Sequence, residues 1–165
     1  MIHDIVNCAF NKLFRQLDMI IINFGEPIKI SIHALCFVRI FKDSTILLTS
    51  SDEFFDKNGN ELKEHASTNT YSHTDKSLLD INIKKVNKLL KGEVVTKVNV
   101  SDLKDVTITF GNDVKVQILP DCLMKDYEYY RFIKFIPYLD EEQKRYQSEH
   151  YVVSNNNGIV VGSMQ

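Results

Sequence analysis

The sequence predicts an α+β fold, in which a curved and mostly antiparallel β-sheet of about seven to nine strands is flanked by two amphipathic helices. Two observations lead to this fold class. Residues 93–120 alternate apolar and polar side chains, as strands do, and residues 2–17 and 76–91 repeat apolar side chains every three or four positions. A chain of 165 residues is long enough for one core, so residues 1–165 are expected to form a single domain.

The first predicted element is an amphipathic helix over residues 2–17. Its apolar stripe follows steps of three and four residues and consists of Ile2, Val6, Ala9 or Phe10, Leu13 and Leu17. The polar face is not rich in lysine and arginine, as a helix on a membrane surface would be. We therefore expect this helix to lie on the sheet.

Strands are predicted next, over residues 19–24, 28–32, 35–41 and 45–49. Ile28, Ile30 and Ile32 alternate with polar residues and are expected to point inward. The last two strands are expected to form a hairpin at Asp43 and Ser44, which are good turn formers. Their continuous apolarity predicts that both of their faces are covered.

The longest irregular segment is predicted over residues 50–75. A long loop in a compact domain is commonly functional or mobile. Its part from 52 to 64 is more acidic than the chain as a whole, so it is expected to steer a basic partner toward the protein. The acidic residues assigned to this partner-binding loop are Asp52, Glu53, Asp56, Glu61 and Glu64.

A second helix is predicted over residues 76–91. Its apolar stripe consists of Leu79, Ile83, Val86 and Leu90, and Gly92 is placed to end it. Lysines gather toward its C-terminal end, where cations interact favourably with the helix dipole. The meander of residues 93–120 follows, and its apolar face must be covered by other elements.

A further strand is predicted over residues 127–136, and a closing hairpin over residues 150–161 turns at an Asn-Gly pair. The strand begins with three tyrosines and an arginine: Tyr127, Tyr129, Tyr130 and Arg131. Aromatic residues beside arginine are common anchors of protein interfaces, and they can also stack on nucleic-acid bases. The ordinary alternative is that the tyrosines pack on the core with their hydroxyl groups in water.

Composition narrows the possible partners and the compartment. A formal net charge of −2 disfavours nonspecific binding of nucleic acid, which requires a basic surplus. Cys8, Cys36 and Cys122 have no paired spacing, so they are expected to be reduced thiols in the core of a cytosolic protein. Neither a signal peptide nor a membrane span is expected, which makes the cytoplasm the expected location.

No catalytic residue, metal or cofactor is expected. His65 and His73 lie in the long loop, but their spacing matches no zinc or calcium motif. The sequence also lacks a nucleophile elbow, a dinucleotide-binding loop and a Walker loop. A small enzyme of unknown reaction is kept as an alternative.

Several segments resemble those of a loose group of small uncharacterised bacterial α+β proteins, some of which are encoded beside polymorphic toxins and treated as immunity proteins. The matching segments are 35–40, 47–52, 95–98, 105–110, 128–132, 150–153 and 158–159. The resemblance implies a sheet with helices and a binding role, and it implies no catalytic residues.

From these observations we expect a non-catalytic protein-binding module of the immunity or inhibitor kind, which neutralises a toxin or nuclease-type protein. The alternative within the binding class is a mobile-element inhibitor of a host nuclease system. The acidic loop and the tyrosine-rich strand are the two candidate binding surfaces.

Overall fold

The computed structural model describes residues 2–62, 77–122, 124, 127–136, 147–154 and 160–164. Among these residues it contains eleven strands, one α-helix and two 3₁₀ helices. The strands are β1 (Phe10–Gln16), β2 (Met19–Phe24), β3 (Ile30–Ala34), β4 (Phe37–Lys42), β5 (Thr45–Thr49), β6 (Val95–Val100), β7 (Val106–Phe110), β8 (Val114–Leu119), β9 (Glu128–Ile136), β10 (Gln147–Ser154) and β11 (Val160–Met164). The helices are η1 (Ile2–Ile5), η2 (Ser50–Phe54) and α1 (Leu78–Leu90).

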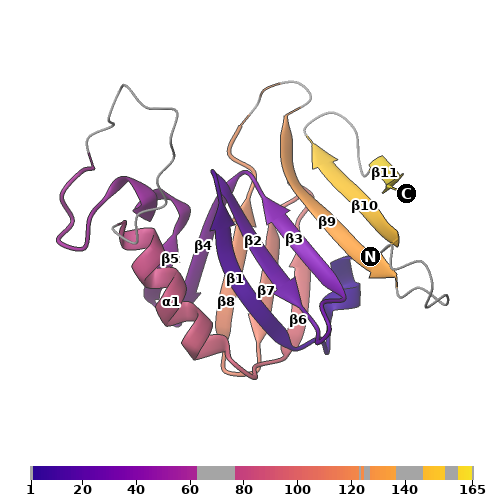
Figure 1. The fold of residues 1–165 in the computed structure, drawn as a ribbon, viewed down its shortest axis with the longest axis horizontal. Helices are drawn as coiled ribbons and strands as arrows, with labels where there is room; N and C mark the ends of the chain where they lie inside the picture. Colours follow the sequence, from indigo (N-terminus) through magenta and orange to yellow (C-terminus); the bar gives the residue numbers. More distant parts are fainter. Residues whose placement is uncertain are drawn as a thin grey trace.

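The strands form two antiparallel sheets that pack face to face (Figure 1). The six-stranded sheet has the order β1-β2-β3-β9-β10-β11, and the five-stranded sheet has the order β5-β4-β8-β7-β6. The prediction of a mostly antiparallel sheet with helices is confirmed in outline. The described residues differ from it in forming two sheets instead of one curved sheet, eleven strands instead of seven to nine, and one α-helix instead of two.

Side chains from the inner faces of both sheets meet in one core. Phe110 of β7 lies at its centre: its ring is edge-on to Phe10 of β1, with ring centroids 5.9 Å apart, and stacks with Phe24 of β2 at 6.5 Å. All three rings are buried. Aromatic contacts of this kind add to the burial of apolar area, so these rings connect the two sheets directly.

The predicted helix over residues 2–17 is wrong. Ile2–Ile5 form a 3₁₀ helix, and the chain then enters β1. A β-bulge between Phe10 and Lys12 places Phe10 and Leu13, which are three residues apart, on the same buried face. This spacing imitates the period of a helix, which is why the stripe misled the prediction.

Residues 7–10 join the two sheets at one corner. The amide of Asn7 donates to the carbonyl of Val95 at 2.8 Å, the amide of Val95 donates to the carbonyl of Cys8 at 3.0 Å, and the amide of Phe10 donates to the carbonyl of Glu93 at 2.8 Å. The chain before β1 is thereby paired with the start of β6. On the other side of the molecule, α1 packs against β1, β5 and η2 (Figure 1).

The helix predicted over residues 76–91 is confirmed as α1. It begins at Ser77, whose hydroxyl accepts a hydrogen bond from the amide of Asp80. Gly92 follows the helix with a φ of 82°, which suits glycine. The predicted stripe is buried as expected: Leu79, Ile83, Val86 and Leu90.

Most of the other predicted strands are confirmed within a few residues, and β4 and β5 form the expected hairpin. β3 begins at Ile30, so Ile28 is 41% exposed in the preceding turn instead of pointing inward. The first part of the segment predicted to be irregular contains η2 and a bridge between Phe55 and Glu61. Residues 63–76, which include His65 and His73, lie outside the described part of the chain.

Candidate functional site

The outer face of the five-stranded sheet is the candidate functional site. On β4, the inward residues Val38 and Ile40 are buried, whereas the outward residues Phe37, Arg39 and Phe41 remain partly exposed. The prediction that this strand is covered on both faces is therefore corrected. We call this surface the basic sheet face; its residues are Phe37, Arg39, Phe41, Lys97, Asn99, Thr107, Thr109, Lys115, Gln117 and Leu119.

The strand register arranges these side chains in rows across the sheet, because directly opposed residues of antiparallel strands share a face. One row runs through Arg39, Gln117, Thr107 and Asn99. The neighbouring row runs through Phe41, Lys115, Thr109 and Lys97. Cations from three strands therefore lie on one surface.

Arg39 is held in place by two neighbours. Its Nε donates a hydrogen bond to Oε1 of Gln117 at 3.1 Å, and its Nη2 donates to the same oxygen. Nε2 of Gln117 in turn contacts the hydroxyl of Thr107 at 3.5 Å. The guanidinium also lies over the ring of Phe41, 5.6 Å from its centroid. These contacts fix the side chain without neutralising its charge.

The positive charge of this face is not balanced within its strands. The five strands contain four basic residues, Arg39, Lys42, Lys97 and Lys115, and no acidic residue. The ammonium of Lys115 lies 5.9 Å from the centroid of the Phe41 ring, and Lys97 is exposed. Among the described residues, neither Arg39, Lys97 nor Lys115 forms an ion pair.

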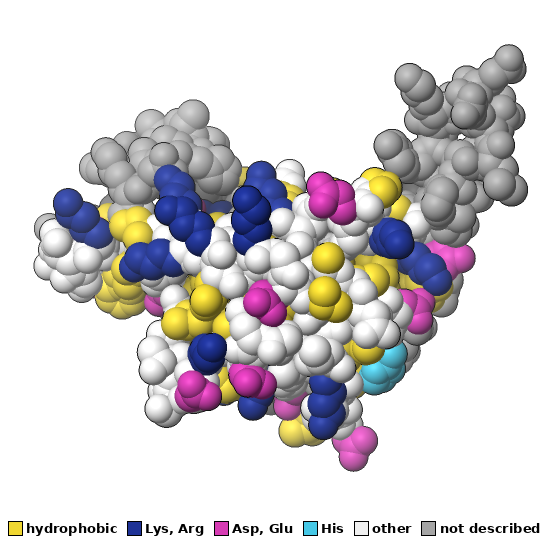
Figure 2. Space-filling model, turned by 90° about the horizontal axis from the view of Figure 1, so that it is seen from below, with side chains coloured by type: hydrophobic (Ala, Val, Ile, Leu, Met, Phe, Trp, Pro, Cys, Tyr) yellow, Lys and Arg dark blue, Asp and Glu magenta, His cyan; other side chains and the backbone are white. Residues whose placement is uncertain are grey.

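Exposed lysines also lie along α1 and at its C-terminal end: Lys84, Lys85, Lys88 and Lys91. Seen from the end of the molecule where α1 terminates, Lys and Arg side chains gather on the side where the helix lies, and hydrophobic side chains form small separate groups (Figure 2). The side-chain amide of Asn112, in the β7–β8 turn, donates to the carbonyl of Leu89 at 3.1 Å. The end of α1 therefore adjoins the turn that leads into the strand of Lys115.

Two residues of the predicted acidic loop are engaged inside the fold. Asp52 accepts hydrogen bonds from the amide and hydroxyl of Thr49, at 3.1 and 2.8 Å, and from the side-chain amide of Asn82 at 3.0 Å. Glu53 forms an ion pair with Arg15 at 3.5 Å. Both carboxylates thus hold η2 against its neighbours.

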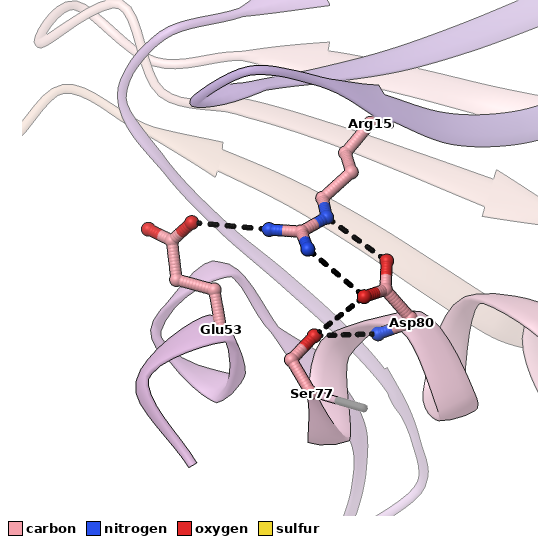
Figure 3. A network of polar contacts seen from close by, with 4 residues as sticks. All are labelled: Arg15, Glu53, Ser77 and Asp80. Atoms are coloured by element: carbon pink, nitrogen blue, oxygen red, sulfur yellow. Dashed lines mark hydrogen bonds and ion pairs between the residues drawn. The ribbon is translucent and has the colours of Figure 1, made fainter. Parts of the chain in front are cut away.

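Arg15 is the centre of a polar network between β1, η2 and α1 (Figure 3). Its Nε and Nη2 each donate to a carboxylate oxygen of Asp80 at 2.9 Å, and the hydroxyl of Ser77 donates to the same carboxylate at 2.8 Å. Burial raises the pKa of Glu53, and the positive charge of Arg15 opposes that shift. The network joins three elements and leaves Arg15 paired.

The side chains of the remaining described acidic residues of the loop, unlike those of Asp52 and Glu53, form no hydrogen bond with a described helix or strand. The exposed carboxylate of Asp56 accepts hydrogen bonds from Asn60 and from the amide of Asn58, which lower its pKa and shape a turn. Glu61 is exposed, and Glu64 lies outside the described residues. Only Asp56 and Glu61 among the described acids of this loop are directed to solvent.

Two of the predicted interface tyrosines belong to the core. Tyr129 and Tyr130 are 4% and 3% exposed, and their hydroxyls donate to the carbonyls of Cys122, at 2.7 Å, and Lys104, at 3.1 Å. Burial raises the pKa of Tyr130 to about 12. Both tyrosines pack on the core as in the alternative interpretation, but their hydroxyls bond to backbone carbonyls, whereas that interpretation placed them in water.

Tyr127 immediately precedes β9, and Arg131 lies within that strand. Tyr127 is partly exposed, and Arg131 forms a paired contact with Glu128, at 2.6 and 2.8 Å. Arg131 is directly opposite His33 of β3. Burial, and then the positive charge of Arg131, lower the pKa of His33. The charge of Arg131 is therefore already matched by a carboxylate.

The described residues contain no group of three or more histidine, cysteine, aspartate or glutamate residues placed to hold a metal ion. Cys8, Cys36 and Cys122 are free thiols, and burial raises the pKa of Cys36 to about 12. Within the same residues, no helix has the length and apolarity needed to cross a membrane.

The sequence predictions missed the basic sheet face, although a signal for it was present. When the charges of the strands at 35–41 and 93–120 are counted by face, the outward positions contain lysine and arginine and no acid. Comparison with known proteins adds no assignment, because no family model, no curated protein and no solved structure matches the chain.

Proposed function

We propose that the protein is a non-catalytic binding module whose partner is another protein, and that it contacts this partner through the basic sheet face. The observation that carries the proposal is Arg39, a partly exposed arginine that is fixed by Gln117 and Phe41 and has no carboxylate partner among the described residues. Arginine and aromatic residues are enriched in protein interfaces, whereas other charged residues are depleted at the centre of an interface.

The surroundings of Arg39 support the same proposal. Phe37 and Leu119 are directly opposed next to the Arg39–Gln117 pair, so apolar area adjoins the cations. A fixed side chain loses little conformational entropy when it binds, which favours affinity. Asp52, Glu53 and Arg131, by contrast, already have partners within the fold.

We further propose that the protein acts in the cytoplasm as an inhibitor of the immunity kind, which neutralises a toxin or nuclease-type protein. The resemblance of its strand segments to those of immunity proteins supports this class. The proposal assigns the interaction to the basic sheet face in place of the acidic loop, because two acids of that loop hold η2.

The test is affinity capture from an extract of the source cells with the intact protein and with a double variant, Arg39→Glu with Lys115→Glu, followed by quantitative mass spectrometry. We expect the partner to be depleted at least about tenfold on the double variant, because reversing two interface charges costs a few kcal/mol. Glu61→Lys is the matched control on the acidic loop and should retain the partner. Equal capture by the wild type and the double variant would refute the proposed surface, and loss on Glu61→Lys alone would assign the partner to the loop.

A further inference from the structure

We infer that the partner surface recognised by the basic sheet face is an acidic protein surface, in which carboxylates lie beside an apolar patch. This inference rests on the proposed function and specifies the chemistry of the partner. It differs from the basic partner expected from the acidic loop.

The first step is the free edge of Arg39. Gln117 occupies the Nε and Nη2 side of the guanidinium through a single oxygen. Among the described residues, Nη1 has no hydrogen-bond partner and the edge formed by Nη1 and Nη2 has no carboxylate partner. Two parallel N–H donors match the two oxygens of a carboxylate. Arg39 is therefore prepared for a carboxylate from another molecule.

The second step is the spacing of the cations. Arg39 and Lys115 lie on neighbouring strands, and Lys97 lies two strands further across the sheet. With strands about 4.8 Å apart, the three charges extend over about 14 Å. A protein surface with several carboxylates can match these three cations, and its apolar residues can contact Phe37 and Leu119.

The surroundings of Phe41 and the net charge of the chain favour a protein over a nucleic acid as the partner. The ring of Phe41 already has the cations of Arg39 and Lys115 near it, at 5.6 and 5.9 Å, so it does not offer a free face for a base. Nonspecific binding of nucleic acid depends on a basic surplus that neutralises phosphates, whereas the basic sheet face belongs to a chain of net charge −2. Carboxylates of a protein are the better match.

The test uses the full chain and three labelled probes in fluorescence anisotropy at low salt: poly-L-glutamate, oligo(dT) and poly-L-lysine. We expect poly-L-glutamate to bind the wild type, and the triple variant Arg39→Gln, Lys97→Gln and Lys115→Gln to bind it about tenfold more weakly. The matched control removes three exposed charges elsewhere, through Lys12→Gln, Lys29→Gln and Lys57→Gln, and should stay within about twofold. Circular dichroism and the urea midpoint show that each variant is folded.

A second variant tests the positioning of Arg39 without changing any charge. Gln117→Ala removes the oxygen that holds the guanidinium, and we expect about threefold weaker binding of poly-L-glutamate. An unchanged affinity would show that the arrangement of Arg39 does not matter and would overturn the first step.

Four outcomes would overturn the inference: no binding of poly-L-glutamate, equal loss in the triple variant and its control, tighter binding of oligo(dT), or preference for poly-L-lysine. Tighter binding of oligo(dT) would assign the face to nucleic acid. The capture experiment decides the proposed function separately: if charge reversal abolishes capture but poly-L-glutamate does not bind, only the acidic character of the partner is refuted.

Discussion

Arg15 and Arg39 are both partly buried, yet their partners differ in charge. Arg15 lies between the carboxylates of Asp80 and Glu53, and its side chain is 17% exposed. Arg39 is held by the neutral amide of Gln117. A guanidinium that already has a well-aligned carboxylate gains little from another one, whereas an unpaired guanidinium gains a charge-assisted hydrogen bond. At the residue scale, this difference separates a structural contact from a binding contact.

The two carboxylates around Arg15 are expected to contribute unequally to stability. Asp80→Asn weakens a paired contact and the hydrogen bond from Ser77, so we expect it to lower the free energy of unfolding by about 2 kcal/mol. Glu53→Gln should lower it by less than about 1 kcal/mol, because the single contact at 3.5 Å is partly exposed to solvent. Urea unfolding followed by circular dichroism measures both values. Equal losses would show that Arg15 depends on both carboxylates to the same degree.

Individual side chains were the least predictable part of the candidate site. Tyr129 and Tyr130 are consecutive in a strand, and regular alternation directs consecutive side chains to opposite faces. A β-bulge at Tyr129, where Val153 pairs with Tyr130 and Ser154 with Glu128, interrupts that alternation, and both tyrosines are buried. Nothing local in the sequence marks this bulge. The burial pattern of β4 does alternate, with Arg39 on the outer face, but the apolar character of the strand had predicted cover on both faces.

At the scale of elements, α1 protects the open edge of β1. The side-chain amide of Asn87 donates to the carbonyl of Leu13 at 2.7 Å, and its oxygen accepts from the amide of Leu13 at 2.9 Å. One asparagine therefore makes the two hydrogen bonds that a neighbouring strand would make. Exposed strand edges promote association, and covering them with a helix is a known solution.

Replacing Asn87 tests this role. Asn87→Ala leaves the amide and carbonyl of Leu13 without their partner, so we expect a loss of about 2 kcal/mol in the free energy of unfolding. The freed edge should also increase self-association, which light scattering after size-exclusion chromatography detects. Lys85→Ala, on the exposed side of the same helix, should change neither quantity appreciably. A loss of stability without any change in association would show that the edge is protected by other means.

Element types were predictable wherever the period of the sequence was undisturbed. The stripe of α1 and the alternation of β7 and β8 gave the correct element type and the correct buried face. In β1 the bulge placed apolar residues three positions apart, and a bulged strand and a helix then produce the same pattern. The error at residues 2–17 is therefore a real ambiguity of the sequence.

At the scale of the whole molecule, the pairing of strands could not be read from the sequence. β9 lies between β3 and β10, although β4 to β8 and α1 separate it from β3 along the chain. The period of each strand is a local property, whereas its partner depends on the packing of the complete core. The same alternation of apolar and polar residues is therefore compatible with two packed sheets and with one curved sheet.

Because the rings of Phe10, Phe24 and Phe110 connect both sheets, the sheets are expected to unfold together. Phe110→Ala removes the central ring, and we expect it to lower the free energy of unfolding by about 3–5 kcal/mol while a single transition is kept. Far-UV circular dichroism and tyrosine fluorescence during urea unfolding should give the same midpoint. Phe54→Ala, at a side chain that is 54% exposed, should change stability by less than about 0.5 kcal/mol. Separate midpoints for the two signals would show that the sheets unfold independently.

The insertion of β9 beside β3 also affects how the protein is made. During translation, β1, β2 and β3 leave the ribosome well before β9 has been synthesised, so the nascent chain carries an unpaired apolar strand for most of its elongation. Unpaired strand edges of this kind are where growing chains pair incorrectly or recruit chaperones. The six-stranded sheet can therefore be completed only late in synthesis.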